Sequence, residues 1–247
     1  MKASEPRANE PRAPSLSPRG LAILGWGSLL ITGWLFFVIA WDVTSHAPLV
    51  LLDGRVAAWL HRHGSPELTA FMLAITHMNS TVGLGAMTVI LALLLARIKQ
   101  WYWMLSVLLA VLGGLSLNLT LKHAYERARP HFDDPWVTLH SYSFPSGHTA
   151  GATAFYGVLA AFLVSRFYDP RQRIAIIVGA VLAVLLVAFS RMYLGAHYLS
   201  DVVAAMASTA AWLALCLTTV HAVAKRRLIA RGAATRSAPA TSVPRPQ

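Results

Sequence analysis

Residues 190–201 read SRMYLGAHYLSD, and an apolar run lies on each side of them, Ile174–Ser190 before and Tyr198–Val220 after. A helix of roughly 20 apolar residues crosses the roughly 30 Å hydrocarbon core of a bilayer. The two runs are therefore predicted membrane spans, and the charged residues between them fall where one span ends and the next begins. Buried ionisable side chains near membrane spans are costly and usually mark functional sites. This stretch predicts a helical membrane fold with a polar site at one end of its helices.

Four further apolar runs precede these two: Leu21–Trp41, Ser80–Leu95, Trp101–Leu121 and Thr149–Val164. The first exceeds the roughly 7–15 apolar residues of a signal peptide and is predicted to remain as an uncleaved span. Val50–Thr76 mixes charged with apolar residues, a pattern typical of one or two helices that lie on the membrane surface. The predicted fold class is an all-α membrane protein with six transmembrane helices and short interfacial helices between spans one and two.

The composition supports a membrane protein with one domain. Of the 247 residues, 56% are hydrophobic and 13% are charged, against about a quarter charged in soluble domains. Proline and charged residues dominate 1–19, and Ala, Ser, Thr, Pro and Arg dominate 225–247, which predicts two disordered cytoplasmic tails around a domain of residues 20–224. The single cysteine, Cys216, lies in the last apolar run and excludes an intramolecular disulfide and a cysteine-based metal site.

The net charge of +11 would indicate nucleic acid binding in a soluble protein, but here the distribution of Lys and Arg reports topology, and no nucleic acid partner is expected. Fifteen of the 21 basic residues lie in the tails and in alternate loops, whereas the other side holds Arg55, Arg62, Lys122, Arg127, Arg129 and Arg191. This bias predicts both termini in the cytoplasm. Three polar segments, Lys122–Pro130, Pro145–His148 and Ser190–Asp201, then face the periplasm or the exterior, with the chain in a bacterial inner (cytoplasmic) membrane.

Three basic residues in these polar segments have the chemistry of a phosphate pocket. Lys122, Arg129 and Arg191 supply fixed cations, the arginines as planar forks and the lysine as a point charge. Ser146 and Gly147 stand where a loop enters an apolar run, so their backbone N–H groups are predicted to point at an anion from a helix N-terminus. These residues predict binding of a phosphate group.

Two histidines and one aspartate complete a site for phosphoryl transfer. His197 and Asp201 are four residues apart, a spacing that on a helix stacks one side chain over the other. The carboxylate can then hold one ring nitrogen of His197 and leave the other lone pair to attack phosphorus. His148 remains as the acid for the leaving group.

The spacings K-x6-R-P, P-S-G-H and S-R-x5-H-x3-D between Lys122 and Asp201 resemble the type 2 phosphatidic acid phosphatase and vanadium haloperoxidase superfamily, and every signature position matches. The resemblance implies catalytic roles for His197, His148 and Asp201, and a phosphohistidine intermediate. A membrane-embedded chain argues against a haloperoxidase, whose relatives are soluble. His123 and Arg127 lie inside the first motif without being signature positions.

The expected function is metal-independent hydrolysis of a lipid phosphate or diphosphate, with no cofactor. Candidate substrates are phosphatidic acid, phosphatidylglycerol phosphate, undecaprenyl diphosphate and lipid A phosphates, and a lipid phosphotransferase or a non-hydrolytic lipid transporter are the alternatives. His131, Asp133 and Asp134 could bind a divalent ion, but the expectation is a solvated loop. The motifs bind the phosphate group that these lipids share, so they do not identify the lipid. The sequence also leaves the oligomeric state open.

Overall fold

A computed structural model describes residues 18–45, 48–137, 139 and 141–237. In these residues the chain is helical without strands, as the long apolar runs predict. The eight helices are α1 (Pro18–Thr44), α2 (Pro48–Arg62), α3 (Pro66–Met78), α4 (Thr81–Arg97), α5 (Trp101–Tyr125), α6 (Gly147–Val164), α7 (Pro170–Tyr193) and α8 (Leu199–Ser237). The all-α fold class is therefore confirmed.

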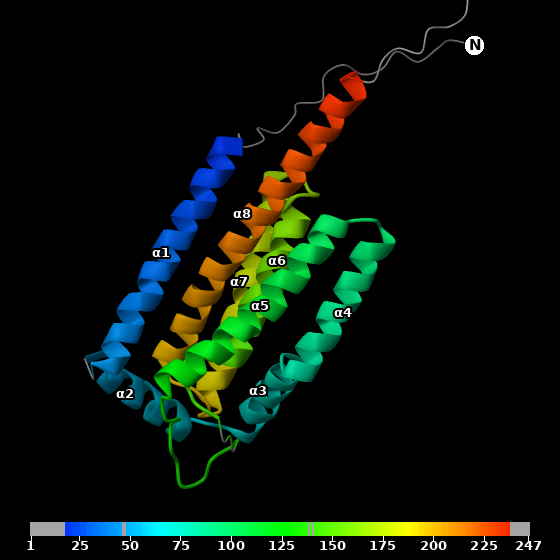
Figure 1. Ribbon diagram of the computed structural model, residues 1–247. Coiled ribbons are helices and arrows are strands. Elements are labelled where there is room, and N and C mark those ends of the chain that lie inside the picture. The colour runs from blue at the N-terminus through cyan, green and yellow to red at the C-terminus, as the bar shows by residue number, and fades with distance from the viewer. Residues whose placement is uncertain (1–17, 46–47, 138, 140, 238–247) are drawn as a thin grey trace, which may run out of the picture.

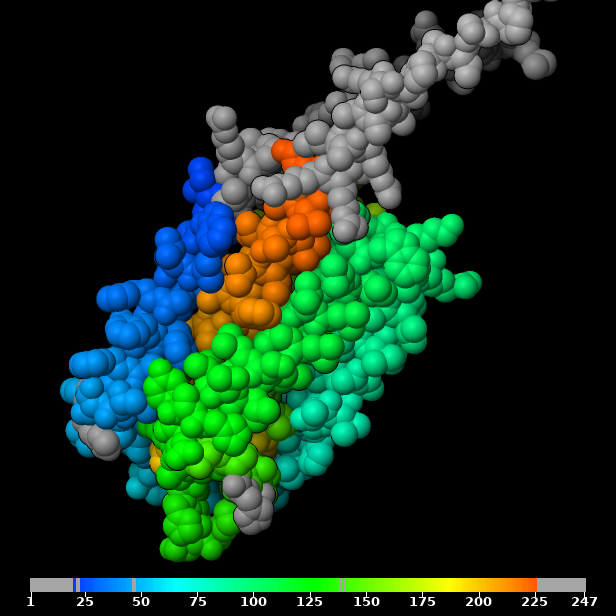
Figure 2. All heavy atoms as spheres, in the orientation of Figure 1, coloured from blue at the N-terminus to red at the C-terminus, as the bar shows by residue number. Residues whose placement is uncertain are grey.

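The long helices run side by side, and α6 and α8 lie at the centre of the bundle (Figure 1). Helix α8 packs against α1, α5 and α6, while α6 also packs against α5 and α7. The short helices α2 and α3 and the loop after α5 gather at the end of the bundle opposite the start of α1 and the end of α8 (Figure 1). In the space-filling view this loop projects beyond the helices (Figure 2). All three polar segments lie at this one end.

Five helices in the described residues are long and apolar enough to cross a membrane, namely α1, α5, α6, α7 and α8. Helices α3 and α4 pass the same test only as a pair, bent by 49° at their junction. The bend has a local cause, because Asn79 ends α3 and the side chain of Ser80 caps α4 by accepting from Gly83 N. The chain is thus an integral membrane protein with five spans, or six if the bent pair counts as one.

The first and last helices extend into the predicted tails. Helix α1 begins at Pro18 and α8 continues to Ser237, so residues 18–19 and 225–237 are helical. Residues 225–231 read KRRLIAR, and Lys, Arg, Leu and Ala are strong helix formers, which lets α8 continue beyond its apolar part. The remaining tail residues, 1–17 and 238–247, lie outside the described residues.

Small residues let the central helices approach closely enough to build the site. Ala154 on α6 and Ala204 and Ala205 on α8 are fully buried, and small side chains at helix contacts are typical of membrane bundles. Gly113 of α5 leaves room for the ring of Trp212, whose Nε1 donates to Leu109 O at 3.0 Å. This close packing brings the N-termini of α6 and α8 together, where Ser146 N donates to the carbonyl of Asp201 at 3.1 Å.

Candidate active site

The third polar segment forms a tight turn between α7 and α8. Gly195 adopts φ +66°, and a Cβ atom there would stand 2.9 Å from the ring of Phe132. Glycine is suited to both conditions, since it adopts the left-handed region without strain. The turn brings the backbone N–H of His197 back to the carbonyl of Arg191 at 3.2 Å. It therefore places His197 directly beside the end of α7.

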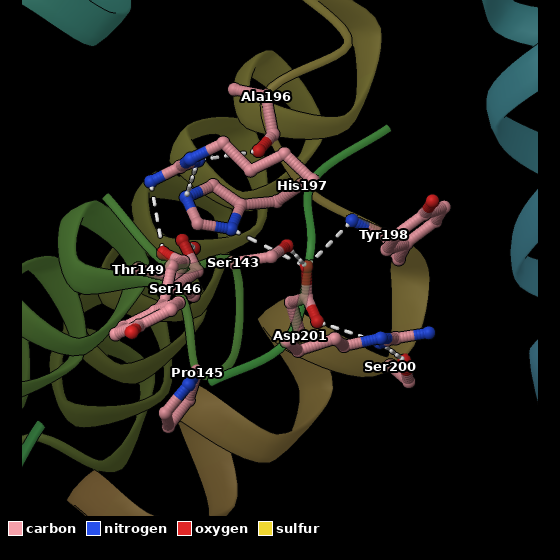
Figure 3. A network of polar contacts seen from close by, with 12 residues as sticks. Ser143, Pro145, Ser146, Thr149, Ala196, His197, Tyr198, Ser200 and Asp201 are labelled. Carbon is pink, nitrogen blue, oxygen red and sulfur yellow. Dashed lines mark hydrogen bonds and ion pairs between the residues drawn. The ribbon is translucent and has the colours of Figure 1, made fainter. Parts of the chain in front are cut away.

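The local structure of His197 differs from the prediction, although Asp201 lies beside it as predicted. His197 lies in the loop before α8, which begins at Leu199, so the pair is not stacked on one helix. Asp201, in the first turn of α8, instead accepts from Tyr198 N at 2.9 Å, as the third residue of a capping box does. The carboxylate thus reaches back past the helix start to His197, and Nδ1 lies 3.4 Å from Oδ2 (Figure 3).

Asp201 is fully buried, and its carboxylate is held from several sides. Oδ2 accepts from Tyr198 N and from the hydroxyl of Ser143, and Oδ1 accepts from Arg127 Nη1 at 2.7 Å (Figure 3). The 3.4 Å contact makes an ion-pair distance with His197, but Nδ1 has no hydrogen-bond partner in the part of the chain described. Catalytic hydrogen bonds are often this long in ligand-free enzymes and shorten on binding. Oδ2 is therefore the acceptor available to Nδ1.

The opposite ring nitrogen of His197 faces Arg129. Nε2 lies 3.2 Å from Arg129 Nη1, which also donates to the carbonyl of Ala196 at 2.6 Å. A guanidinium only donates, so Nε2 carries the lone pair and Nδ1, beside Asp201, carries the proton. Burial, with the charges of Arg129 and Arg191, lowers the pKa of His197 to about 3 despite the opposing effect of Asp201. The imidazole is thus neutral near pH 7 and has the tautomer of a nucleophile.

The three predicted phosphate-binding cations meet around this ring. Lys122, in the last turn of α5, donates through Nζ to the carbonyl of Tyr142 at 2.5 Å. Arg129 is held by the carbonyls of Ser141 and Tyr142, and burial lowers the pKa of its guanidinium from the ordinary value. All three cations lie close enough to one another, and to His148, for their charges to interact.

Arg191 is the most enclosed of the three cations. The residue is 3% exposed, and its Nη1 donates to Thr76 Oγ1 of α3 at 2.6 Å. Its Nε is buried and has no hydrogen-bond partner among the described residues. A buried donor without a partner is costly unless a ligand supplies an acceptor. Arg191 therefore marks a position where an anion fits.

The second polar segment enters the site at the start of α6. Ser146 is the N-cap residue and Gly147 the first helical residue, so the predicted helix N-terminus is present. Ser146 is fully buried; its N–H donates to Asp201 O and its hydroxyl accepts from Thr149 Oγ1 at 3.0 Å (Figure 3). The N–H of Ser146 therefore joins α6 to α8 and does not point at an anion as predicted. A Cβ atom on Gly147 would stand 3.9 Å from Lys122 Cε, so this residue lies beside one of the cations.

Comparison with known proteins agrees with these motifs. Residues 101–225 match the family model described as the PAP2 superfamily. The chain belongs to the PAP2 superfamily. It is 39% identical over 140 residues to phosphatidylglycerophosphatase B of Bacillus subtilis, covering 56% of this chain and 68% of that protein. It is also 38% identical over 121 residues to a lipid A 1-phosphatase of Rhizobium johnstonii, covering 45% of each.

Solved structures of PAP2 proteins share the fold. A transmembrane PAP2-type phosphatidylglycerolphosphate phosphatase from Bacillus subtilis superposes with a TM-score of 0.70 at 28% identity, covering 81% of this chain and 96% of that one. LpxE of Aquifex aeolicus superposes with a TM-score of 0.55 at 23% identity, covering 67% and 94%. The resemblance inferred from the motifs is confirmed, and the protein is a membrane phosphatase of the PAP2 superfamily.

Two residues beside Asp201 had no assigned role in the sequence. Asp53 stood in the mixed segment predicted to lie on the membrane surface, yet it is fully buried. Arg127, inside the first motif, pairs with both Asp53 and Asp201. His123, its neighbour in the motif, is exposed on α5 and packs edge-on against Tyr142. No local pattern distinguishes Asp53, because its partners are 74 and 147 residues away along the chain.

The loop proposed as an alternative metal site is attached to α2. Asp134 pairs with His61 Nε2 at 2.8 Å, and the ring of Phe132 stacks on that histidine at 4.0 Å. A pocket of about 300 Å³ lies between this loop and the turn at Gly195, with Arg129 in its wall. The loop thus forms one side of the opening next to the cations.

Proposed function

We propose that this PAP2 protein hydrolyses a phosphate monoester or diphosphate of a membrane lipid without a metal ion, through a phosphohistidine on His197. The observation that carries this proposal is a charge imbalance. The site contains four basic side chains, Arg127, Arg129, Arg191 and Lys122, but its buried carboxylates are Asp53 and Asp201, both paired with Arg127. A phosphate monoester with a charge of roughly −1.5 to −2 would neutralise the excess.

The first step is in-line attack by His197. With phosphate held by Lys122, Arg129 and Arg191, the Nε2 lone pair forms the N–P bond as the bond from phosphorus to the lipid oxygen breaks. Arg129 Nη1 now lies beside Nε2 and would turn its donor to a phosphate oxygen. Asp201 stabilises the positive charge that develops on the ring through Nδ1, and protonated His148 gives its proton to the departing oxygen.

The second step returns the enzyme to its starting state. His148, now neutral, removes a proton from a water molecule, whose oxygen attacks phosphorus while the N–P bond breaks. The products are inorganic phosphate and neutral His197, and the proton is back on His148. The charge of bound phosphate favours the protonated form of His148, which otherwise lies among cations.

The lipid is the least constrained part of this function. Phosphatidylglycerol phosphate is the first candidate, because the relative at 39% identity is named a phosphatidylglycerophosphatase. Lipid A phosphates follow from the second relative, and phosphatidic acid and undecaprenyl diphosphate offer the same phosphate chemistry. A phosphotransferase would differ only in the acceptor that replaces water, and a transporter would not form the N–P bond.

The proposed topology has six spans, with α3 and α4 joined as the bent second span and α2 on the membrane surface. Both termini are cytoplasmic, and the site faces the periplasm. Support comes from the position of the three motif segments opposite the start of α1 and the end of α8, together with the distribution of Lys and Arg (Figure 1). Residues 20–224 form the catalytic domain. Right-side-out vesicles should release phosphate from a substrate added outside.

Purified protein in detergent tests the function directly. Phosphate release is measured on a panel of phosphatidic acid, phosphatidylglycerol phosphate, undecaprenyl diphosphate and lipid A. His197→Ala should abolish turnover while inorganic phosphate still binds, and His221→Ala, at an exposed position on α8, is the matched control. Activity of His197→Ala close to that of the unmodified protein would exclude the phosphohistidine. Transfer of the phosphoryl group from the lipid to an added alcohol would identify a phosphotransferase.

A further inference from the structure

Arg127 sits in the first motif but turns away from the phosphate position. Its side chain is 12% exposed, and its guanidinium lies over the ring of Tyr198 at 4.4 Å. Nη1 donates to Asp201 Oδ1 and to Ser200 Oγ, each at 2.7 Å. Nη2 donates to Asp53 Oδ2 at 2.8 Å. Both terminal nitrogens of the guanidinium are thus bonded, Nη1 to the start of α8 and Nη2 to α2.

Asp53 holds the far side of this arrangement. Its carboxylate is 0% exposed, Oδ1 accepts from Ser200 N at 2.9 Å, and Oδ2 accepts from Arg127 and from the hydroxyl of Ser200. A carboxylate at the N-terminus of a helix is stabilised by the helix dipole and by the free N–H groups there. Asp53 therefore ties α2 both to the first turn of α8 and to the guanidinium.

The bond from Arg127 decides how Asp201 presents itself to His197. Because Arg127 occupies Oδ1, the carboxylate cannot rotate about Cβ–Cγ without losing a charged hydrogen bond. Oδ2 is then left facing Nδ1 of His197, with Tyr198 N and Ser143 Oγ on the same oxygen. The attraction of Arg127 to two carboxylates also raises the pKa of its guanidinium although burial opposes it, so the fork stays charged.

We infer that Asp53 and Arg127 are positioning residues, which orient Asp201 and through it the nucleophile His197. The chain of contacts runs from α2 through the guanidinium to the carboxylate and ends at the imidazole. Neither residue touches the phosphate. The inference rests on the proposed function, since it assigns the pair to the attack by His197.

The test compares Arg127→Gln, Asp53→Asn and the double variant with the unmodified protein. Arg55→Gln and Asp169→Asn are matched controls, because both residues are exposed and Asp169 lies at the start of α7, at the opposite end of that helix from Arg191. The measurements are kcat and KM for phosphate release, the inhibition constant of inorganic phosphate, and the unfolding temperature in detergent. Arg127→Gln should lower kcat by roughly 100-fold, the loss expected of a misplaced nucleophile. Its KM and its inhibition constant for inorganic phosphate should stay within about threefold of the values for the unmodified protein.

The double variant separates positioning from stability. Arg127→Gln leaves Asp53 buried without a cation, so it should unfold at a lower temperature, and adding Asp53→Asn should recover part of that loss. The kcat of the double variant should nevertheless remain low, because Asp201 still lacks the guanidinium of Arg127. Should Arg127→Gln fail to fold, Asp53→Asn alone keeps the guanidinium, and a roughly 10-fold loss of kcat at constant KM is expected.

Three results would overturn the inference. These are a folded Arg127→Gln protein with kcat within about threefold of normal, a kcat that recovers together with the unfolding temperature, and phosphate inhibition weakened as much as kcat. The last result would make Arg127 a phosphate ligand. An unmodified protein that releases no phosphate from any lipid of the panel would instead overturn the proposed function.

Discussion

Replacing Asp201 with Asn tests whether the buried carboxylate selects the tautomer of His197. The carboxylate accepts from Arg127 on one oxygen and from Tyr198 N and Ser143 on the other. An amide has an acceptor on one side and two N–H groups on the other. Whichever way the Asn side chain lies, its NH₂ group meets a donor that cannot turn into an acceptor, either the guanidinium or the backbone N–H of Tyr198.

The magnitude follows from two separate losses. An unsatisfied buried donor costs about 1–3 kcal/mol of folding stability. In a Ser-His-Asp triad the same substitution lowers kcat about 10⁴-fold through the wrong tautomer. The Nδ1 to Oδ2 distance here is 3.4 Å, longer than a strong hydrogen bond. We therefore expect a loss of about 10³-fold, or roughly 4 kcal/mol in the activation free energy.

The assay is phosphate release from the preferred lipid by purified Asp201→Asn protein, with Asp169→Asn as the control for an exposed carboxylate. Binding of inorganic phosphate should be unchanged or slightly tighter, because a negative charge near the cations has been removed. A correctly folded Asp201→Asn protein that keeps more than about a tenth of the normal kcat would refute the role given to this carboxylate.

Three further predictions concern pH, metal and the turn. Burial lowers the pKa of His197 to about 3 in the folded protein, whereas a histidine in the unfolded chain has a pKa of about 6.5. Between these two pH values the unfolded state binds more protons than the folded state. The contribution of neutral His197 to folding stability is therefore complete above about pH 6.5 and is lost as the pH falls toward 3. The unfolding temperature should fall over that range, and fall less in His197→Gln. Phosphate release should persist in EDTA, and its complete loss would show that the loop at Asp133 and Asp134 holds a required metal. Gly195→Ala should lower stability by about 1–2 kcal/mol, from positive φ and the contact with Phe132, whereas Gly179→Ala, in open space on α7, should be neutral or stabilising; unfolding temperatures measure both.

Much of the site could be predicted because its residues lie in short segments with regular spacing. Lys122, in the last turn of α5, and Arg129, in the loop after it, are seven residues apart, Ser146 and Gly147 begin α6, and Arg191 lies six residues before His197. Spacing of this kind along the chain does not depend on the tertiary packing. It predicted that His197 and Asp201 lie together, but it placed both on one helix, whereas α8 begins at Leu199 and His197 lies in the turn before it.

The supporting residues could not be predicted, because they come from elements with no motif. Thr76 on α3 binds Arg191 from 115 residues away, and Asp53 on α2 binds Ser200 from 147 residues away. In sequence, the charged residues of Val50–Thr76 indicated only a surface helix. Burial of Asp53 depends on where α2 docks, and that position is set by tertiary packing against α1, α7 and α8.

Assembly of the site and docking of α2 are coupled by charge. Asp53 and Asp201 are both fully buried, and both pair with the guanidinium of Arg127. Separating one member of such a buried group costs about 3–5 kcal/mol, because a charge is left without a partner away from water. Were α2 to leave the start of α8, Arg127 would lose Asp53, and Asp53 would lose the N–H of Ser200. The state with α2 docked is therefore the state in which Oδ2 of Asp201 faces His197, and a change that loosens α2 should reduce kcat without touching a phosphate ligand.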